Sequence, residues 1–124
     1  MKLLLDTHAA LWFLGGDERL SDSARRHVVD DTNVVLLSAA VAWEVSIKRS
    51  LGKLAVPDEY VSLLVGAGVQ PLAVSVEHAA AVQALPWHHR DPFDRMLVAQ
   101  AGVEGAALVS RDDALRAYGV TVLW

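Results

Sequence analysis

Short apolar runs alternate along the chain with longer segments in which apolar residues recur at helical spacing. The runs are too brief for helices, and their unbroken apolar character is typical of strands that are covered on both faces. They predict strands at residues 2–5, 34–37, 71–74, 107–109 and 120–124. The segments between them predict helices at residues 8–14, 22–30, 39–51, 58–65, 76–84 and 92–101.

Residues that favour helix termini support these boundaries. The predicted N-caps are polar side chains that can accept free backbone N–H groups: Ser21, Ser38, Ser75 and Asp91. The predicted helices end near residues that do not favour helix: Gly15 and Gly16, Gly52, Pro86 and Gly102. No repeat, low-complexity tract or linker interrupts the series. We therefore expect residues 1–124 to form a single α/β domain, an α/β/α sandwich around a mostly parallel five-stranded sheet.

The composition narrows the classes of function. Hydrophobic residues make up 53% of the chain and charged residues 21%, a balance typical of a globular domain. The absence of cysteine excludes disulfides, thiolate zinc sites and a cysteine nucleophile. The net charge of -4 argues against binding nucleic acid through a broad basic surface. Asp6 interrupts the N-terminal apolar run too early for a secretory signal or a membrane span, so we expect a cytoplasmic protein without a membrane partner.

Acidic side chains follow the predicted strands or lie on the helices next to them. In open parallel sheets, ligands bind beyond the carboxyl ends of the strands. Asp6 follows the first strand, Glu44 lies on the helix after the second, Asp94 opens the helix before the fourth, and Asp112 and Asp113 follow the fourth. Carboxylates gathered at one edge would repel one another unless a cation neutralised them. Oxygen ligands without cysteine favour Mg²⁺ or Mn²⁺ over zinc.

The first two acids also have ordinary structural explanations. Asp6 or Thr7 would cap the first helix, and capping is the simpler interpretation of a lone aspartate at a strand end. Glu44 would pair with Lys48 one helical turn later, an interaction that stabilises an exposed helix by only about 0.2–0.5 kcal/mol. The apolar neighbours of Glu44 argue against a wholly exposed face, and both interpretations of this residue stay open.

The remaining acids can be explained in the same way. In the segment HHRDPFDRML, Asp91 and Asp94 fit the Ncap and N3 positions of the last long helix. Asp112 or Asp113 would cap the short helix that follows the fourth strand. Capping and pairing thus explain the acids one at a time. They do not explain why four elements place acids toward the same edge of one sheet.

Four segments together resemble the PIN domains, and within them the VapC-like ribonuclease toxins of prokaryotic toxin–antitoxin pairs. The segments are LLLDTHAALWFL, SAAVAWEVSIKRSLGKL, HHRDPFDRMLVAQA and LVSRDDALRAYGVTVLW, and together they extend from one end of the chain to the other. Their order and spacing carry the resemblance, since none is decisive alone. The resemblance implies a PIN-like fold, a Mg²⁺-dependent endoribonuclease toxin, and a metal site formed by Asp6, Glu44, Asp94 and Asp112. It also implies an RNA substrate, a cognate antitoxin that covers the pocket, and a homodimer.

The resemblance extends to residues around the proposed metal site. Ser110 stands where the family more often has threonine, which leaves a hydroxyl before the last acid. Asp113 adjoins Asp112, so the choice of fourth ligand between them stays open. The remaining candidates for a supporting role at the metal or the substrate are Thr7, Asp91, Arg90 and Arg95. For the arginines, pairing with the acids is a simpler role than holding an RNA phosphate.

The implied reaction is hydrolysis of RNA phosphodiester bonds with one or two metal ions, which leaves 5′-phosphate and 3′-hydroxyl ends. A metal-free ribonuclease that used histidines and the RNA 2′-hydroxyl would leave a 2′,3′-cyclic phosphate instead. His8 lies beside the proposed pocket, and we expect a loop role for His88 and His89, because adjacent residues point in different directions. Trp87 is the tryptophan expected to contact substrate. The others are expected to pack in the core: Trp12, Trp43 and Trp124.

Other classes of protein fit the pattern less well. A phosphoacceptor receiver domain would need an aspartate after a middle strand and a lysine after a late strand, where Ser38 and the SRDD segment lie. A phosphatase of the haloacid dehalogenase kind would need a second aspartate where His8 stands. The alternative that we retain is a catalytically silent metal-binding or protein-interaction module with a PIN-like fold. The presence of all four acids argues against such a loss of activity.

Overall fold

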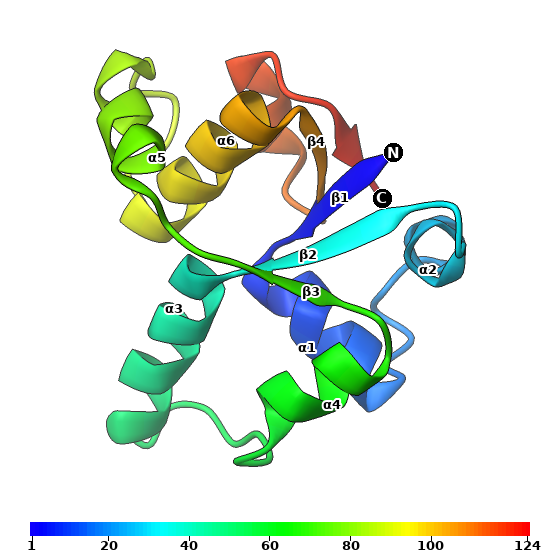
Figure 1. The fold of residues 1–124 in the computed structure, drawn as a ribbon. Coiled ribbons are helices and arrows are strands. Elements are labelled where there is room, and N and C mark those ends of the chain that lie inside the picture. Colours follow the sequence, from blue (N-terminus) through cyan, green and yellow to red (C-terminus); the bar gives the residue numbers. More distant parts are fainter.

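Five short apolar runs form a single parallel sheet. The computed structural model describes residues 1–124, with strands β1 (Lys2–Leu5), β2 (Val34–Ser38), β3 (Gln70–Leu72), β4 (Ala106–Val109) and β5 (Val122–Leu123). The strand order is β3-β2-β1-β4-β5, and every neighbouring pair is parallel. β1 therefore lies at the centre of the sheet, between β2 and the distant β4 (Figure 1). The predicted fold class is confirmed, and the sheet is wholly parallel.

Helices fill the connections between the strands. The α-helices are α1 (Thr7–Gly15), α2 (Asp22–Val29), α3 (Ala39–Ser50), α4 (Tyr60–Gly66), α5 (Val76–Ala81) and α6 (Pro92–Glu104), and the 3₁₀ helices are η1 (Val82–Ala84) and η2 (Asp113–Tyr118). Figure 1 shows α5 and α6 on one side of the sheet and α1, α2 and α4 on the other. Helix α3 begins directly after β2 and extends away from the sheet. None of these helices has the length and apolar character required to cross a membrane.

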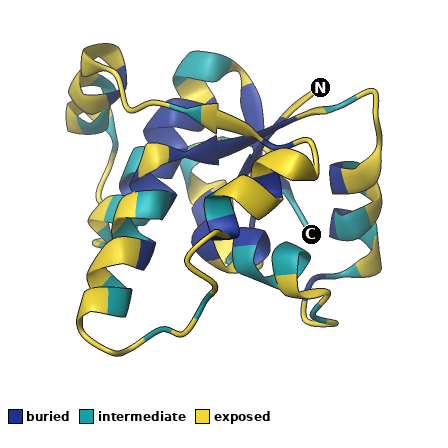
Figure 2. Cartoon of the chain, turned by 60° about the horizontal axis from the view of Figure 1, so that its bottom comes forward, coloured by how far each residue is buried: buried dark blue, intermediate teal, exposed yellow.

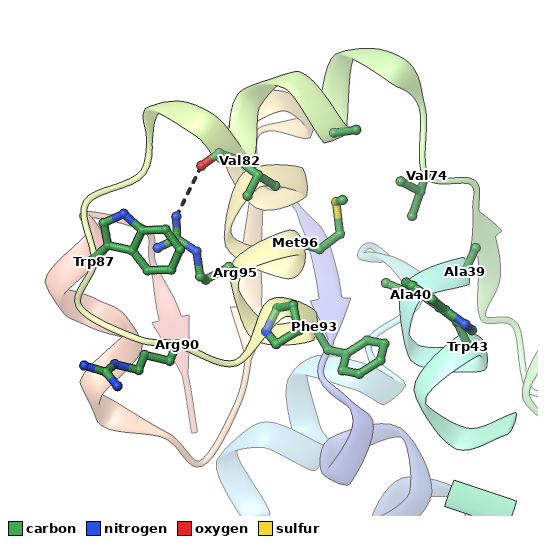
Figure 3. Close-up of a pocket in the computed structure, with 12 residues that line it drawn as sticks. Ala39, Ala40, Trp43, Val74, Val82, Trp87, Arg90, Phe93, Arg95 and Met96 are labelled. Atoms are coloured by element: carbon green, nitrogen blue, oxygen red, sulfur yellow. Dashed lines mark hydrogen bonds between the residues drawn. The ribbon is translucent and has the colours of Figure 1, made fainter. Parts of the chain in front are cut away.

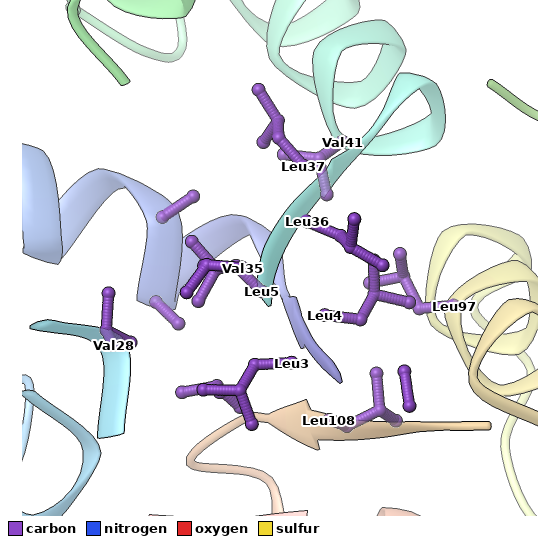
Figure 4. Close-up of a cluster of buried hydrophobic side chains, with 14 of the residues drawn as sticks. Leu3, Leu4, Leu5, Val28, Val35, Leu36, Leu37, Val41, Leu97 and Leu108 are labelled. Atoms are coloured by element: carbon purple, nitrogen blue, oxygen red, sulfur yellow. The ribbon is translucent and has the colours of Figure 1, made fainter. Parts of the chain in front are cut away.

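The hydrophobic core lies between the sheet and both helical layers. Leu3, Leu4 and Leu5 of β1 are fully buried, as expected for a central strand that is covered on both faces. They belong to a cluster of 25 buried residues, in which side chains of β2, β4, α3 and α6 surround them (Figure 4). Figure 2 shows the complementary pattern, with exposed residues on the outer helix faces and in the loops. Burial of each leucine stabilises the folded protein by about 1.5–3 kcal/mol. This packing fixes the position of β1 and of the residue that follows it.

The helix starts marked by the four predicted N-caps agree with the structure, whereas α4 begins at Tyr60 instead of residue 58, and one predicted end is wrong. Each of the four predicted N-cap side chains accepts a hydrogen bond from a backbone N–H of its helix. Helix α6 does not stop at Gly102. It continues to Glu104 and ends at Gly105, whose φ of 64° lies in the left-handed region that glycine adopts at little cost. Gly102 is an exposed helical position, and a methyl side chain there would meet no atom within 4 Å.

Three other elements are shorter than predicted. The strand expected at residues 71–74 is observed at Gln70–Leu72, and the one expected at 120–124 is reduced to Val122–Leu123. Both are edge strands, so each has only one neighbour with which to pair. Helix α5 ends at Ala81, and its continuation tightens into the 3₁₀ helix η1 before Pro86.

Candidate metal centre

The four predicted acids line one cleft beyond the carboxyl ends of β1 and β4. Asp6 directly follows β1 and Asp112 lies in the loop after β4, and these two strands are parallel neighbours. Glu44 comes from the second turn of α3 and Asp94 from the first turn of α6. Together with Asp91, they line a cleft of about 530 Å³. The fold thus brings acids from four separate elements into one place.

Asp6 is both a helix cap and a cleft residue. Its Oδ1 accepts a hydrogen bond from the backbone N–H of Ala9 at 2.8 Å, which caps α1. Burial raises the pKa of Asp6 above its ordinary value, against the lowering effect of hydrogen bonds from the Ser110 hydroxyl and from Ala9. Because the cap engages one carboxylate oxygen, the capping interpretation is correct and does not exclude a second role in the cleft.

Glu44 is held by two partners. Lys48 Nζ lies 2.6 Å from Oε2, and the hydroxyl of Thr7 donates to Oε1 at 2.6 Å. The predicted pairing with Lys48 is therefore confirmed. The Glu44 side chain is nevertheless only 12% exposed, so it does not belong to a solvated helix face. Thr7 is buried and follows Asp6, and its hydrogen bond fixes Glu44 beside that residue.

Asp91 and Asp94 have different positions at the start of α6. Asp91 Oδ1 accepts two backbone N–H groups of the first turn, at 2.8 and 3.2 Å, and so caps the helix. Asp94 lies within that first turn and lines the cleft. Burial, together with the negative charges of Asp91, Asp6 and Glu44, raises the pKa of Asp94 to about 6, against the lowering effect of His89. The carboxylates are thus close enough to repel one another.

Asp112 and the adjacent Asp113 lie in different environments. Asp112 lines the cleft and caps η2 by accepting the backbone N–H of Ala114 at 3.1 Å. Its own backbone N–H donates to Ser110 Oγ at 3.0 Å, which holds the loop in place. The Asp113 side chain is 84% exposed and pairs with Arg116 outside the cleft. Of the two residues, Asp112 is therefore the better placed to act with the other acids.

His89 faces the acids, although the sequence predicted only a loop role. Its Nε2 lies 3.3 Å from a carboxylate oxygen of Asp112 and 3.5 Å from one of Asp94. The backbone N–H of Asp91 donates to Nδ1 at 3.2 Å, so the neutral ring carries its proton on Nε2 and directs it at the acids. His88 instead packs edge-on against a tyrosine. The position of His89 two residues before a helix cap was the signal in the sequence, because a side chain there can fold back over the first turn.

Arg95 does not have the predicted role. It is only 3% exposed, and its guanidinium donates to three backbone carbonyls of residues 82–86 and to the hydroxyl of Tyr118. The ring of Trp87 covers it, with 3.8 Å between the guanidinium carbon and the ring centroid. The prediction that Arg95 pairs with acids or holds a phosphate is wrong. Arg95 instead fixes the segment that carries His89 between α5 and α6.

Two tryptophans also lie elsewhere than predicted. Trp87, the expected substrate contact, lines an apolar groove outside the acidic cleft, together with Arg90. Trp43, expected in the core, is 65% exposed and meets Phe93 edge-on in the same groove. Trp12 does pack against the core, but it also lines the acidic cleft. Apolar neighbours in the sequence therefore did not reveal which rings reach the surface.

The carboxylates in the cleft fit a hard divalent cation. Carboxylate oxygens of Asp94 and Asp112 lie within 4.8 Å of each other and of Nε2 of His89, whose N–H faces them. Lys48 is the one lysine or arginine that pairs with any of the four acids, so their negative charge is largely uncompensated. Clustered carboxylates are the ligands that Mg²⁺ and Mn²⁺ prefer.

An α/β sandwich with clustered carboxylates at the carboxyl edge of its parallel sheet defines a class of protein that is suited to divalent-metal chemistry. The family model for the PIN domain matches residues 3–120, and the chain belongs to this family. Over 120 residues the chain is 31% identical to Ribonuclease VapC22 of Mycobacterium tuberculosis, a match that covers 94% of this chain and 91% of that relative. The predicted resemblance to VapC-like PIN domains is confirmed.

Solved structures share this fold at lower sequence identity. A chain of VapBC2 from Rickettsia felis, bound to a DNA fragment from their promoter, matches with a TM-score of 0.71 and 15% identity, covering 98% of this chain and 97% of that one. A chain of FitAcB from Neisseria gonorrhoeae matches with a TM-score of 0.55 and 19% identity, covering 97% and 95% of the two chains. At these identities the matches establish the fold alone.

Proposed function

We propose that this chain is a Mg²⁺-dependent endoribonuclease, with Mn²⁺ as an alternative metal, and that it acts as the toxin of a toxin–antitoxin pair in the cytoplasm. The observation that carries the proposal is the convergence of Asp6, Glu44, Asp94 and Asp112 on one cleft. Membership of the PIN family and the identity to a relative named a ribonuclease support RNA as the substrate. Residues 1–124 would act as a single PIN domain.

In this proposal the four acids hold the metal and the residues around them fix their positions. When bound, Mg²⁺ supplies a Lewis acid that stabilises the negative charge developing on the scissile phosphate. Thr7 orients Glu44 through its hydroxyl. The Ser110 hydroxyl contacts two acids: it hydrogen-bonds to the Asp6 carboxylate and accepts the backbone N–H of Asp112. Asp91 supports Asp94 by capping the helix that carries it. The chain thus orders its acids before RNA binds.

A cognate antitoxin is the proposed protein partner. One structural relative belongs to VapBC2 and the other to FitAcB, and the chain is a VapC-like PIN domain. The largely uncompensated carboxylates of the cleft are complementary to a cationic segment. An antitoxin that covered the cleft with such a segment would exclude RNA from the metal site.

We also propose a homodimer formed through the apolar groove between α3, α5 and α6 (Figure 3). The groove has a volume of about 650 Å³ and is lined mainly by apolar side chains, among them Trp43, Phe93 and Met96. Trp43 is 65% exposed and Trp87 is 77% exposed. Contiguous apolar surface of this kind marks interfaces between proteins, and tryptophan is enriched among residues that dominate binding.

Cleavage of a mixed pool of structured RNAs tests the enzymatic proposal. Purified protein should cut RNA with Mg²⁺ and not with EDTA, and the products should carry 5′-phosphate and 3′-hydroxyl ends. Asp94→Asn should slow cleavage by on the order of 100-fold, because it removes a charged ligand from the cleft. Asp113→Asn is the matched control and should cut at the wild-type rate, since Asp113 lies outside the cleft.

Other results would support other functions. Products with 2′,3′-cyclic phosphate ends in EDTA would indicate the metal-free histidine mechanism. Absence of cleavage, combined with Mn²⁺ binding that Asp94→Asn abolishes, would support the catalytically silent metal-binding module. If neither cleavage nor metal binding occurred, the acids would have only their capping and pairing roles.

A further inference from the structure

The acidic cleft is also lined by side chains that are not candidate metal ligands. These side chains come from α1, from the loop after it and from the loop after β4. We call them the aromatic wall; its members are His8, Trp12, Arg19 and Arg111. None of them caps a helix or contacts one of the four acids through an ion pair. Their combination of rings and cations requires an explanation of its own.

The two rings of the aromatic wall form a fixed platform. The imidazole of His8 stacks on the indole of Trp12, with ring centroids 5.2 Å apart and planes inclined by 11°. Trp124 meets Trp12 edge-on at 5.8 Å, and Trp12 packs against the hydrophobic core. His8 is exposed, whereas Trp12 is half-buried. The cleft therefore presents a flat, accessible imidazole that is backed by an indole packed against the core.

Two guanidinium groups lie beside this platform. Their central carbons are 4.9 Å (Arg19) and 5.9 Å (Arg111) from the centroid of Trp12. Arg19 is paired with Asp17 at 2.7 Å. Arg111 is exposed, and no carboxylate lies within 4.0 Å of it. Because Arg111 immediately precedes Asp112, an uncommitted positive charge stands next to the proposed metal site.

A flat ring and a free guanidinium beside the acids match the parts of one nucleotide. Unpaired bases stack on aromatic side chains, and arginine binds phosphate through paired N–H groups. We propose that the aromatic wall binds the nucleotide next to the scissile phosphate of single-stranded RNA. The base stacks on His8 and the neighbouring phosphate pairs with Arg111. This proposal rests on the proposed ribonuclease function and assigns the residues that hold the base and the phosphate.

Stacking selects RNA by structure rather than by base sequence. The bases of a duplex are stacked on one another and cannot reach His8, whereas the bases of loops and single strands can. Every base has a flat face, so the platform accepts all four. The enzyme would therefore cut in unpaired segments, and any preference for sequence would come from other contacts.

Fluorescence anisotropy with a labelled single-stranded RNA of 12 nucleotides tests the proposal, with Ca²⁺ replacing Mg²⁺ to suppress cleavage. His8→Ala should weaken binding by about 5- to 150-fold, the range that loss of one stacked base predicts, and His8→Phe should retain most of the affinity. Arg111→Gln should weaken binding. It should also reduce the slope of log Kd against log salt concentration by about 0.7, the value expected for the loss of one phosphate contact. When the same RNA is part of a perfect duplex, its affinity should be the same for the wild type and for His8→Ala.

Arg116→Gln is the matched control for charge. Arg116 pairs with Asp113 outside the cleft, so this variant should bind RNA like the wild type. Wild-type affinity in both His8→Ala and Arg111→Gln, with circular dichroism showing a folded protein, would overturn the proposal. If His8→Ala and Arg111→Gln lost equal affinity for single-stranded and duplex RNA, the proposal would also be overturned. If these variants bound RNA normally and lost only the binding of a hepta-glutamate peptide, the aromatic wall would bind a protein partner instead.

The cleavage assay separates failure of this proposal from failure of the enzymatic one. If the wild type cut the RNA pool while both variants bound and cut like the wild type, only the aromatic wall would lose its proposed role. If the wild type neither cut nor bound any RNA, the ribonuclease proposal would fail as well.

Discussion

Single carboxylates in the cleft combine a structural role with the proposed metal-binding role. Asp6 and Asp112 each use Oδ1 to cap a helix, and both line the cleft. A cap fixes the direction of a carboxylate through a backbone N–H group, and it adds no side chain that would block access to the second oxygen. For these two residues, helix capping and preorganisation of the cleft are therefore the same interaction, which is why capping was a sufficient explanation of each one in the sequence.

His89 is expected to act as a positioning residue. Its Nε2–H lies between carboxylate oxygens of Asp94 and Asp112, so His89→Ala should let these acids separate and should weaken Mn²⁺ binding by about 10-fold in isothermal titration calorimetry. His89→Gln, which retains an N–H donor, should recover part of the affinity. His88→Ala is the matched control and should bind Mn²⁺ normally. A nitrogen coupling in the electron paramagnetic resonance of bound Mn²⁺ that vanished in His89→Ala would contradict this role and identify His89 as a ligand.

The raised pKa of Asp94 predicts a dependence of folding stability on pH. A pKa of about 6, above the ordinary 3.8, means that the folded protein binds this proton more tightly than the unfolded chain does. In EDTA, the stability gained from protonation is therefore fully present below about pH 3.8 and lost as the pH rises through about 6. Asp94→Asn should raise the free energy of unfolding at pH 7.5 by on the order of 1 kcal/mol, a value reduced for partial exposure, and change it little at pH 4.

Urea unfolding at the two pH values measures this difference. Asp31→Asn changes an exposed acid far from the cleft and should have the same small effect at both pH values. Mg²⁺ should stabilise the wild type at pH 7.5 more than Asp94→Asn, because a ligand that binds the folded state stabilises it. An effect of Asp94→Asn that did not vary with pH would show that this carboxyl is not destabilised by its surroundings.

At the scale of elements, local sequence patterns predicted those strands and helix starts that depend mainly on interactions between residues close together in the chain. Continuous apolar runs identified β1 and β4, and polar residues before apolar periodicity identified the helix caps. Gly102 misled the prediction because one glycine costs a helix only about 1 kcal/mol, which the packing of α6 outweighs. The edge strands were overestimated because their length depends on a single neighbour, which the chain does not specify locally.

The site was predictable where a residue follows directly from the end of an element. Asp6 and Asp94 are placed by β1 and α6 alone, and their role as metal ligands remains a proposal. His89 and Arg95 could not be placed in this way, because both depend on Tyr118, which is more than 20 residues away in the sequence. The tyrosine hydroxyl accepts hydrogen bonds from the backbone N–H of His89 and from the Arg95 guanidinium. Only the assembled fold shows that contact.

At the scale of the whole molecule, the apolar groove and the acidic cleft share the same elements. Helix α3 contributes Trp43 to the apolar groove and Glu44 to the acidic cleft. The start of α6 contributes Phe93 to the groove and Asp94 to the cleft. A second copy bound in the groove would therefore lie next to the cleft.

The proposed homodimer predicts that Trp43→Glu produces a monomer. Trp43 and Trp87 together expose roughly 300 Å² of surface. Each partner in a stable interface buries about 800 Å², so these two side chains would supply a large share of it. A charge at position 43 would have to be buried unpaired in the dimer, while in the monomer it stays in water because Trp43 is 65% exposed. Light scattering after gel filtration should give twice 13.4 kDa for the wild type and 13.4 kDa for the variant.

Leu63→Glu is the matched control, because Leu63 is a 46% exposed apolar residue of α4, outside the groove. It should remain dimeric, and both variants should bind Mn²⁺ like the wild type, since Thr7 and Lys48 hold Glu44 independently of Trp43. A monomeric wild type would contradict the dimer itself. A dimer that survived Trp43→Glu and dissociated in Leu63→Glu would move the interface to the exposed face of α4.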